Sequence, residues 1–167
     1  MFSKPAPITS THDVKNFDCG NTALNEFLVK YAVANAAAGL ARTFVATIKE
    51  QPTVIGYFSI AAGSVERETV PERVAKGTPK HAIPVVLLAR LAVDLNYQGQ
   101  KVGEGLLKEA LLKILAASSI IGVRAVLVHA KDQKAAAFYA QYGFVSSPLD
   151  SFHMMLILKD IAKIVSA

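Results

Sequence analysis

The segment NYQGQKVGEGLL, residues 96–107, follows an apolar run that ends in LAVD and precedes LLKEALLKILA, which repeats like a helix. Its glycines, Gly99, Gly103 and Gly105, give the backbone a freedom that costs conformational entropy wherever the chain is ordered. A strand, a glycine-rich turn and a helix together form an anion site, because the first helical N–H groups are unpaired and lie at the positive end of the helix dipole. The segment therefore predicts a phosphate ligand, with a tightly packed turn as the alternative from these residues alone.

Two common phosphate-binding motifs do not fit this spacing. The pattern GxGxxG would place glycines at positions 99, 101 and 104, where Lys101 and Glu104 stand. A Walker motif has a glycine, four further residues and then Gly-Lys-Ser/Thr, and this segment contains no Gly-Lys-Ser/Thr. Neither a dinucleotide-binding fold nor a P-loop is supported, although backbone amides can still bind pyrophosphate with Lys101 adding positive charge.

The pattern along the whole chain predicts strands that alternate with helices in one domain, residues 1–167. This order favours an α/β or α+β layered fold with parallel strand pairing near its middle. The apolar tail FHMMLILKDIAKIV is open to burial in the core, in a dimer or against a partner. The predicted helices run from Asn21 or Thr22 to Gly39, over 102–117 and over 134–142, with a short one inside 66–81; the predicted strands are 42–48, 54–65, 84–94, 124–131 and 152–159.

Composition narrows the class of protein. The 167 residues carry 18 Lys and Arg against 13 Asp and Glu, which favours a polyanionic partner such as nucleic acid; a mildly basic protein without one is the alternative. Cys19 is the only cysteine, so we expect no intrachain disulfide and no metal site. The N-terminal sequence lacks the apolar core of a secretory signal, and no apolar stretch approaches the ~18 residues of a membrane span. We therefore expect a cytoplasmic protein that does not enter the membrane.

Two segments carry a resemblance to a known family. QKVGEG, residues 100–105, resembles the Q/R-x-x-G-x-G/A motif with which GCN5-related N-acetyltransferases (GNAT) hold the pyrophosphate of acetyl-coenzyme A, although Lys101 replaces a glycine common there. DQKAAAFYAQYGF, residues 132–144, resembles the second signature, N-x-x-A-x-x-F-Y-x-x-x-G-F, with Asp132 where asparagine is usual. Further segments, among them FDCGNTALNEFL and IPVVLLARLAVD, extend the resemblance to the toxin branch of this superfamily.

The resemblance implies a fold, a reaction and partners. The fold would be a mixed central sheet splayed around the acetyl-coenzyme A site, with flanking helices. The toxins acetylate the amino group of aminoacyl-tRNA, are neutralised by a ribbon-helix-helix antitoxin and are commonly homodimers. The residues implied to bind the coenzyme are Leu91, Ala92, Val93, Gln98, Gly99, Gln100, Lys101, Val102, Gly103, Glu104, Gly105, Asp132 and Phe138.

Acetyl transfer to an amine needs a neutral amine, stabilisation of an oxyanion and a proton for the departing thiolate. The resemblance assigns the oxyanion to a backbone amide of Leu91, Ala92 or Val93, and the proton to Tyr139. A phenol with a pKa near 10 protonates a thiolate near 8.5 at a cost of about 2 kcal/mol, so we expect Tyr139 to act by strong hydrogen bonding and concerted transfer. The alternative is that Tyr139 only packs beside Phe138.

No residue is clearly marked as a general base. His129 falls on a buried strand and is expected to be structural, while His12, His81 and His153 stand alone. Deprotonation at pH 7 costs a lysine about 4.6 kcal/mol and an α-amine near pKa 8 only about 1.4 kcal/mol, which favours an α-amine as acceptor. The candidates for contact with RNA phosphates are Arg90, Arg73, Lys76, Lys80 and Lys30.

The function predicted from these observations is a toxin N-acetyltransferase of aminoacyl-tRNA. A non-toxic acetyltransferase of a small amine or of a protein N-terminus is the second hypothesis. A coenzyme-binding module without turnover is a third, and the presence of both Tyr139 and the complete loop argues against it.

Overall fold

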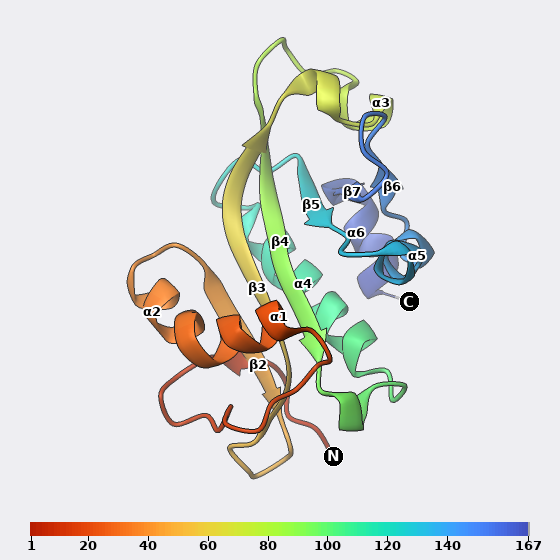
Figure 1. Ribbon diagram of the computed structural model, residues 1–167. Coiled ribbons are helices and arrows are strands. Elements are labelled where there is room, and N and C mark those ends of the chain that lie inside the picture. Colours follow the sequence, from red (N-terminus) through yellow and green to blue (C-terminus); the bar gives the residue numbers. More distant parts are fainter. Residues whose placement is uncertain (167) are drawn as a thin grey trace. The chain divides into compact units, whose positions relative to one another are not determined.

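The computed structural model describes residues 1–166 and contains a seven-stranded mixed sheet with the strand order β1-β2-β3-β4-β5-β7-β6 (Figure 1). Two long strands, β3 (Val54–Val65) and β4 (Ile83–Val93), each run through both of the compact units into which the chain folds. Unit 1 comprises residues 1–61 and 89–110. Unit 2 comprises residues 62–88 and the described chain from 111 onward. The predicted fold class, α/β with a mixed sheet, is confirmed.

Unit 1 contains an antiparallel part of the sheet and the first helical segment. β1 (Ala6–Pro7) pairs with β2 (Arg42–Thr47), and β2 pairs with β3 in the predicted hairpin. The predicted helix begins as expected, with the Asn21 side chain accepting a hydrogen bond from the Leu24 N–H, but it is interrupted. It consists of α1 (Thr22–Glu26), a π-helical turn η1 (Phe27–Tyr31) and α2 (Ala32–Ala37), which lies against β2 (Figure 1).

A close approach between β3 and the helix α4 (Val102–Ala117) depends on Gly56. A Cβ atom at this position would lie 2.9 Å from the Leu106 side chain and 3.2 Å from the carbonyl oxygen of Ala92. A larger residue would force the Leu106 side chain of α4 to move and would also press on the backbone of β4 at Ala92. Gly56 therefore sets how closely the start of α4 packs on the strands of unit 1.

Unit 2 is built on parallel and antiparallel pairing around β5 (Ala125–His129). β5 pairs in parallel with β4, with Val85 opposite Ala125, which confirms the predicted parallel pairing. On its other side β5 pairs antiparallel with β7 (His153–Ile157). The remaining elements of unit 2 are η2 (Arg67–Thr69), α3 (Glu72–Ala75), the end of α4, α5 (Gln133–Gln141), β6 (Val145–Ser146) and α6 (Leu158–Val165).

The C-terminal segment corrects one prediction. The strand predicted over 152–159 ends at Ile157, and the chain continues as helix α6. Leu158 is half-buried and Ile161, three residues later, is completely buried, while Lys159 and Lys163 are exposed; this is the spacing of a helix rather than of a strand. The tail therefore buries apolar side chains within its own chain. None of the helices within residues 1–166 has the length and apolar character that crossing a membrane requires.

Candidate active site

The loop that precedes α4 is held in place by the side chains of Asp94 and Gln98. Asp94 is buried, and its carboxylate accepts hydrogen bonds from the backbone N–H groups of Asp18 at 3.1 Å and Asn96 at 2.9 Å. The Gln98 amide donates to the carbonyl oxygen of Val93 at 2.9 Å. These bonds are internal to unit 1, so the loop has a defined conformation without any ligand. Sequence reasoning missed Asp94, although a carboxylate at the end of an apolar strand was a visible signal.

Two residues of this loop have left-handed backbone conformations. Gly99 has φ +78° and Lys101 has φ +64°. Glycine adopts this region freely, whereas a lysine pays about 1 kcal/mol for it. The strain at Lys101 explains why the resembling motif commonly has glycine at this position. The Lys101 side chain is exposed at the start of the helix, where it adds a positive charge.

The first turn of α4 provides unpaired backbone donors. The Gly105 N–H donates to the Lys101 carbonyl oxygen at 3.1 Å, so the N–H groups of residues 102–104 precede the first intrahelical bond. A Cβ atom at Gly105 would meet nothing within 4 Å, which leaves space beside this turn. Glu104 lies in the turn, but its carboxylate is 3.4 Å from the Lys108 ammonium, which offsets its repulsion of an anion. The arrangement suits a phosphate or pyrophosphate group.

The residues predicted to stabilise the oxyanion, Leu91, Ala92 and Val93, end β4 directly before this loop. All three lie in unit 1, with Ala92 buried and the other two half-buried. The Ala92 carbonyl oxygen lies next to Gly56 of β3, beside the Leu106 side chain of α4. The backbone of this strand end is therefore supported from both the helix and the loop.

Tyr139 and its neighbours belong to unit 2 and lie on α5. The Asp132 side chain caps this helix by accepting a hydrogen bond from the Ala135 N–H at 2.8 Å, a role that asparagine fills equally well. The Tyr139 ring packs edge-on against Phe138 and Phe144, with centroid distances of 5.2 and 5.4 Å. Phe138 is half-buried and Tyr139 is buried, so this pair supports the position of the phenol.

The Tyr139 hydroxyl is available as a hydrogen-bond donor. It makes no hydrogen bond within residues 1–166, and no fully buried polar side-chain atom there lacks a partner, so the hydroxyl reaches the surface. Burial of the side chain raises its pKa to about 12. Transfer of the Tyr139 proton to a free thiolate, whose thiol has a pKa near 8.5, then costs about 5 kcal/mol. For a phenol with the ordinary pKa near 10 the same transfer costs about 2 kcal/mol. The phenol therefore remains protonated at physiological pH and is better suited to hydrogen bonding than to releasing a free proton.

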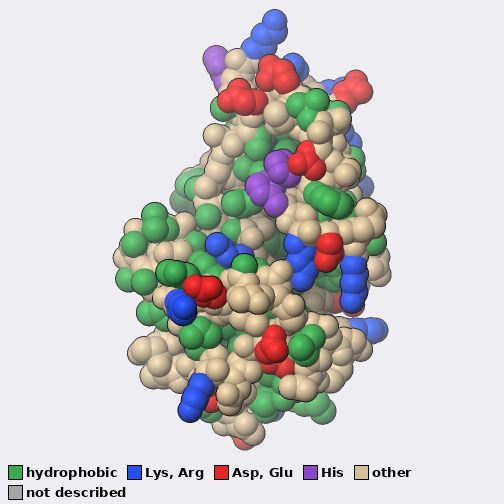
Figure 2. All heavy atoms as spheres, in the orientation of Figure 1, with side chains coloured by type: hydrophobic (Ala, Val, Ile, Leu, Met, Phe, Trp, Pro, Cys, Tyr) green, Lys and Arg blue, Asp and Glu red, His purple; other side chains and the backbone are tan. Residues whose placement is uncertain are grey.

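The histidines of unit 2 differ from the expectation. His129 lies at the end of β5, but its side chain is exposed rather than buried. It stacks on His153 of β7 at 4.1 Å, and the His153 Nε2 is 3.6 Å from the Asp150 carboxylate, so His153 does not stand alone. Histidine side chains are visible on the face shown in Figure 2. Partial shielding from water by its neighbours, followed by the charge of His153, lowers the pKa of His129, which favours the neutral imidazole at pH 7.

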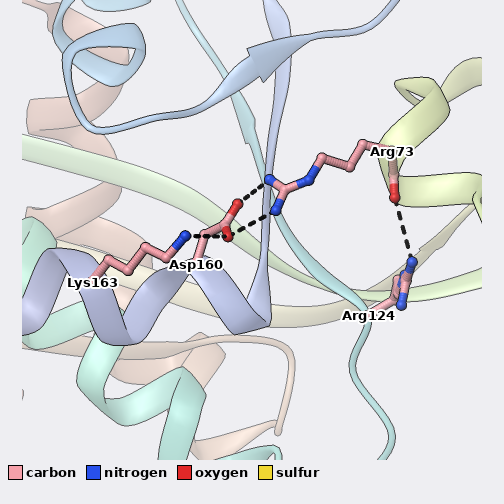
Figure 3. Close-up of polar contacts among 4 residues, drawn as sticks. All are labelled: Arg73, Arg124, Asp160 and Lys163. Carbon is pink, nitrogen blue, oxygen red and sulfur yellow. Dashed lines mark hydrogen bonds and ion pairs between the residues drawn. The ribbon is translucent and has the colours of Figure 1, made fainter.

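The five predicted RNA-binding side chains fall into two groups. Three are engaged: Arg90 lies over the Phe27 ring at 3.6 Å, Lys30 is 3.3 Å from the Glu26 carboxylate, and Arg73 pairs with Asp160 (Figure 3). Positive and negative side chains are interspersed on the face shown in Figure 2. The other two, Lys76 and Lys80, are exposed and form no ion pair within residues 1–166.

Unit 2 also contains a surface pocket of about 300 Å³ next to this charged connection. Its lining includes Thr78, His81 and Arg124 together with apolar side chains. No three His, Cys, Asp or Glu side chains within residues 1–166 are grouped in a way that could bind a metal ion.

The sequence matches the family described as acetyltransferase (GNAT) domain over residues 40–146. It is 39% identical over 164 residues to a tRNA-acetylating toxin of Mycobacterium tuberculosis, covering 98% of this chain and 97% of that protein. The structure resembles AtaT complexed with acetyl-methionyl-tRNAfMet, with a TM-score of 0.89, 28% identity and 98% of both chains covered. It also resembles a tyrosine-to-phenylalanine variant of AtaT bound to acetyl-CoA and the C-terminus of the antitoxin AtaR, with a TM-score of 0.84, 26% identity and 99% of both chains covered. The chain belongs to the GNAT acetyltransferase family.

Proposed function

We propose that this protein is a toxin that transfers an acetyl group from acetyl-CoA to the α-amino group of aminoacyl-tRNA and thereby inhibits translation. The observation that carries the proposal is the 39% identity, over nearly the whole of both chains, to a tRNA-acetylating toxin. The likeness to AtaT complexed with an acetylated aminoacyl-tRNA supports the same substrate. We further propose that residues 1–167 form one acetyltransferase domain.

The residues before and at the start of α4 fit the coenzyme. The unpaired N–H groups of residues 102–104 and the ammonium of Lys101 would bind its pyrophosphate, and the open space at Gly105 admits it. Acetyl-CoA supplies the activated acetyl thioester. Gln98, Asp132 and Phe138 support the site by holding the loop and α5, because their contacts are made to the protein itself.

Two groups of the chain would act on the reacting atoms. A backbone N–H among Leu91, Ala92 and Val93 would donate to the thioester oxygen as negative charge develops on it. The Tyr139 hydroxyl, still protonated because its pKa is about 12, would donate a hydrogen bond to the departing sulfur. The acceptor needs little assistance, because about a tenth of an α-amine near pKa 8 is neutral at pH 7.

The proposal includes partners and location. An antitoxin is supported by the likeness to AtaT bound to the C-terminus of AtaR, and the family resemblance suggests that it is a ribbon-helix-helix protein. The same resemblance suggests a homodimer. A substrate that is charged tRNA places the protein in the cytoplasm.

Incubation with labelled acetyl-CoA and charged tRNA tests the proposal. We expect N-acetyl-aminoacyl-tRNA as product, and a loss of rate of about 10²-fold in Tyr139→Phe, the lower range for removal of a general acid. Expression should arrest growth in wild type and not in this variant. Acetylation of a small amine or a protein N-terminus, with charged tRNA left unmodified, would support the non-toxic alternative instead.

The pH dependence of the rate gives a second check. Because the pKa of Tyr139 is raised to about 12, its proton is retained throughout the range in which an ordinary tyrosine ionises. We expect the rate to rise as the α-amine deprotonates near pH 8 and then to stay level past pH 10. A fall centred at pH 10 would show that the essential phenol has an ordinary pKa.

A further inference from the structure

The one-turn helix α3 (Glu72–Ala75) is too short to persist by its own hydrogen bonds. Arg124, which directly precedes β5, anchors its end. The Arg124 guanidinium donates to the carbonyl oxygens of Val74 and Lys76, both at 2.9 Å. It also donates to the Arg73 carbonyl oxygen at 3.4 Å, as Figure 3 shows. Val74 is also buried in the core of unit 2. The end of α3 is therefore attached to the fold at a defined place.

A second attachment joins α3 to the C-terminal helix α6. The Arg73 guanidinium faces the Asp160 carboxylate with two nitrogens, one of them 3.0 Å from Oδ1 (Figure 3). This two-pronged geometry is specific to arginine and orients both partners. Arg73 holds the pKa of Asp160 below its usual range, so the pair is charged at neutral pH. Lys163 lies 3.9 Å from the same carboxylate but does not contact α3.

The residues beyond α3 present two unengaged positive charges. Gly77, with φ +79°, turns the chain, and the Thr78 hydroxyl donates to the Ala75 carbonyl oxygen at 2.6 Å. Lys76 and Lys80 are thus placed in a short loop whose starting point is α3. Their ammonium groups are exposed and form no ion pair with the described part of the chain.

We infer that the ion pair between Arg73 and Asp160 is a clamp that positions Lys76 and Lys80 against tRNA phosphates, and that Arg73 itself does not contact the RNA. This inference rests on the proposed function and deepens it. Without the clamp, the end of α3 keeps the bonds that Arg124 and Arg67 make to its carbonyl oxygens, so the protein stays folded, but the helix is no longer fixed from α6. The lysines then sample more positions, and ordering them on RNA costs binding free energy.

The variant Asp160→Asn separates the clamp from simple electrostatics. Removal of a negative charge near an RNA site should by itself strengthen RNA binding. The clamp predicts the opposite: KM for charged tRNA rises about three- to tenfold, in line with one oriented ion pair, while kcat and KM for acetyl-CoA are unchanged. Arg73→Gln should have the same effect. Lys163→Ala, a matched control that removes a charge beside Asp160, should change none of these constants.

A charge reversal tests whether the two residues act as a pair. In the double variant Arg73→Asp with Asp160→Arg, the ion pair can form with opposite polarity, so KM for charged tRNA should improve on that of either reversed single variant. Thermal melting of each variant verifies that it folds, and Asp160→Glu, which keeps the charge, should remain close to wild type in KM.

Three results would overturn the inference. A raised KM in Arg73→Gln together with an unchanged or lowered KM in Asp160→Asn would show that Arg73 contacts RNA directly. An unchanged KM for charged tRNA in both variants would show that the ion pair does not position the loop. A charge-reversed double variant whose KM is no better than that of the weaker single reversal would show that Arg73 and Asp160 do not act as a pair. Failure of the proposed function is a different result, since wild type would then form no N-acetyl-aminoacyl-tRNA, and the inference would fall with it.

Discussion

Two regions of this protein are proposed to contact phosphate, and they are built in opposite ways. The loop before α4 offers backbone N–H groups at the start of a long helix; its shape is set mostly within the loop, by Asp94, Gln98 and left-handed residues, and Asp94 also accepts from the distant Asp18 N–H. The connection after α3 offers the ammonium groups of Lys76 and Lys80 at the end of a single helical turn. A backbone site needs a fixed chain path, whereas a side-chain site needs an anchor from elsewhere in the fold.

The difference predicts where each region is sensitive to mutation. In the first, the phosphate ligands themselves cannot be removed by substitution, so the supporting side chains and the packing of α4 become the vulnerable points. In the second, the ligands can be removed singly, and the support comes from Arg124 and Asp160, which lie 48 and 87 residues from the positions they hold.

Among the variants that probe these two regions, the largest effect is expected for Asp94→Ala. The substitution leaves the N–H groups of Asp18 and Asn96 without their acceptor, and loss of a charge-assisted partner at a buried site costs about 2–3 kcal/mol. We expect acetyl-CoA affinity, measured by calorimetry, to fall by at least about tenfold as the loop loosens. Asp94→Asn retains one acceptor oxygen and should fall between wild type and alanine. Equal affinity in all three would show that the loop does not depend on Asp94.

Gly56→Ala should destabilise the protein by about 1–3 kcal/mol, the cost of an overpacked methyl group. The new Cβ would lie 2.9 Å from Leu106, a flexible side chain, and 3.2 Å from the backbone oxygen of Ala92, which cannot rotate away. Thermal melting measures this loss. Gly39→Ala is not a matched control because Gly39 has φ +74°; Gly63→Ala is one, since its nearest neighbour would be 3.6 Å away. A melting temperature as high as that of Gly63→Ala would contradict the close approach.

Lys76→Ala should weaken tRNA binding about equally for all sequences, because a phosphate contact carries no sequence information. The slope of log affinity against log salt concentration should become less steep by about one unit. Lys49→Ala in unit 1, also an exposed lysine, serves as the control and should leave the slope unchanged. An unaltered slope in Lys76→Ala would remove this lysine from the RNA contact.

The smallest effect is expected for Lys101→Gly. Glycine adopts the left-handed conformation at φ +64° without strain, which adds about 1 kcal/mol to the free energy of unfolding. The greater conformational entropy of glycine in the unfolded chain largely offsets this gain. Stability should therefore change by less than about 1 kcal/mol in thermal melting. Acetyl-CoA affinity should fall a few-fold, about the effect of one exposed charge. A large loss of affinity would mean that Lys101 contributes more to phosphate binding than the backbone does.

Much of the fold was predictable because its signals are local. The helix over 102–117 and the hairpin of β2 and β3 were predicted nearly to the residue from apolar spacing, turn residues and glycines. The end of β7 was misplaced because HMMLI runs directly into LKDIAKIV. No glycine, proline or other turn residue marks the point where the strand pattern of apolar residues gives way to the helix pattern. The π-helical turn within the first helix has no distinctive composition and was also missed.

The candidate site was only partly predictable, for a related reason. The loop, Tyr139 and the free lysines were visible in the sequence, but the roles of the cations were not. Arg73, Lys76 and Lys80 look alike as a row of charges, yet only Arg73 meets a carboxylate from the C-terminal helix. The exposed pairing of His129 with His153 was hidden because it depends on the register of β5 and β7.

The sequence by itself determined the glycine-rich turn between a buried strand and a long helix, the phenol on a later short helix and an excess of positive charge. These depend on intervals of a few residues, where backbone geometry links residue type directly to conformation. Only the tertiary structure decided that Asp94 supports the turn, that Gly56 is the point of closest packing and that Arg73 is held by Asp160. Such contacts join residues far apart along the chain, and no local preference specifies which charges will meet.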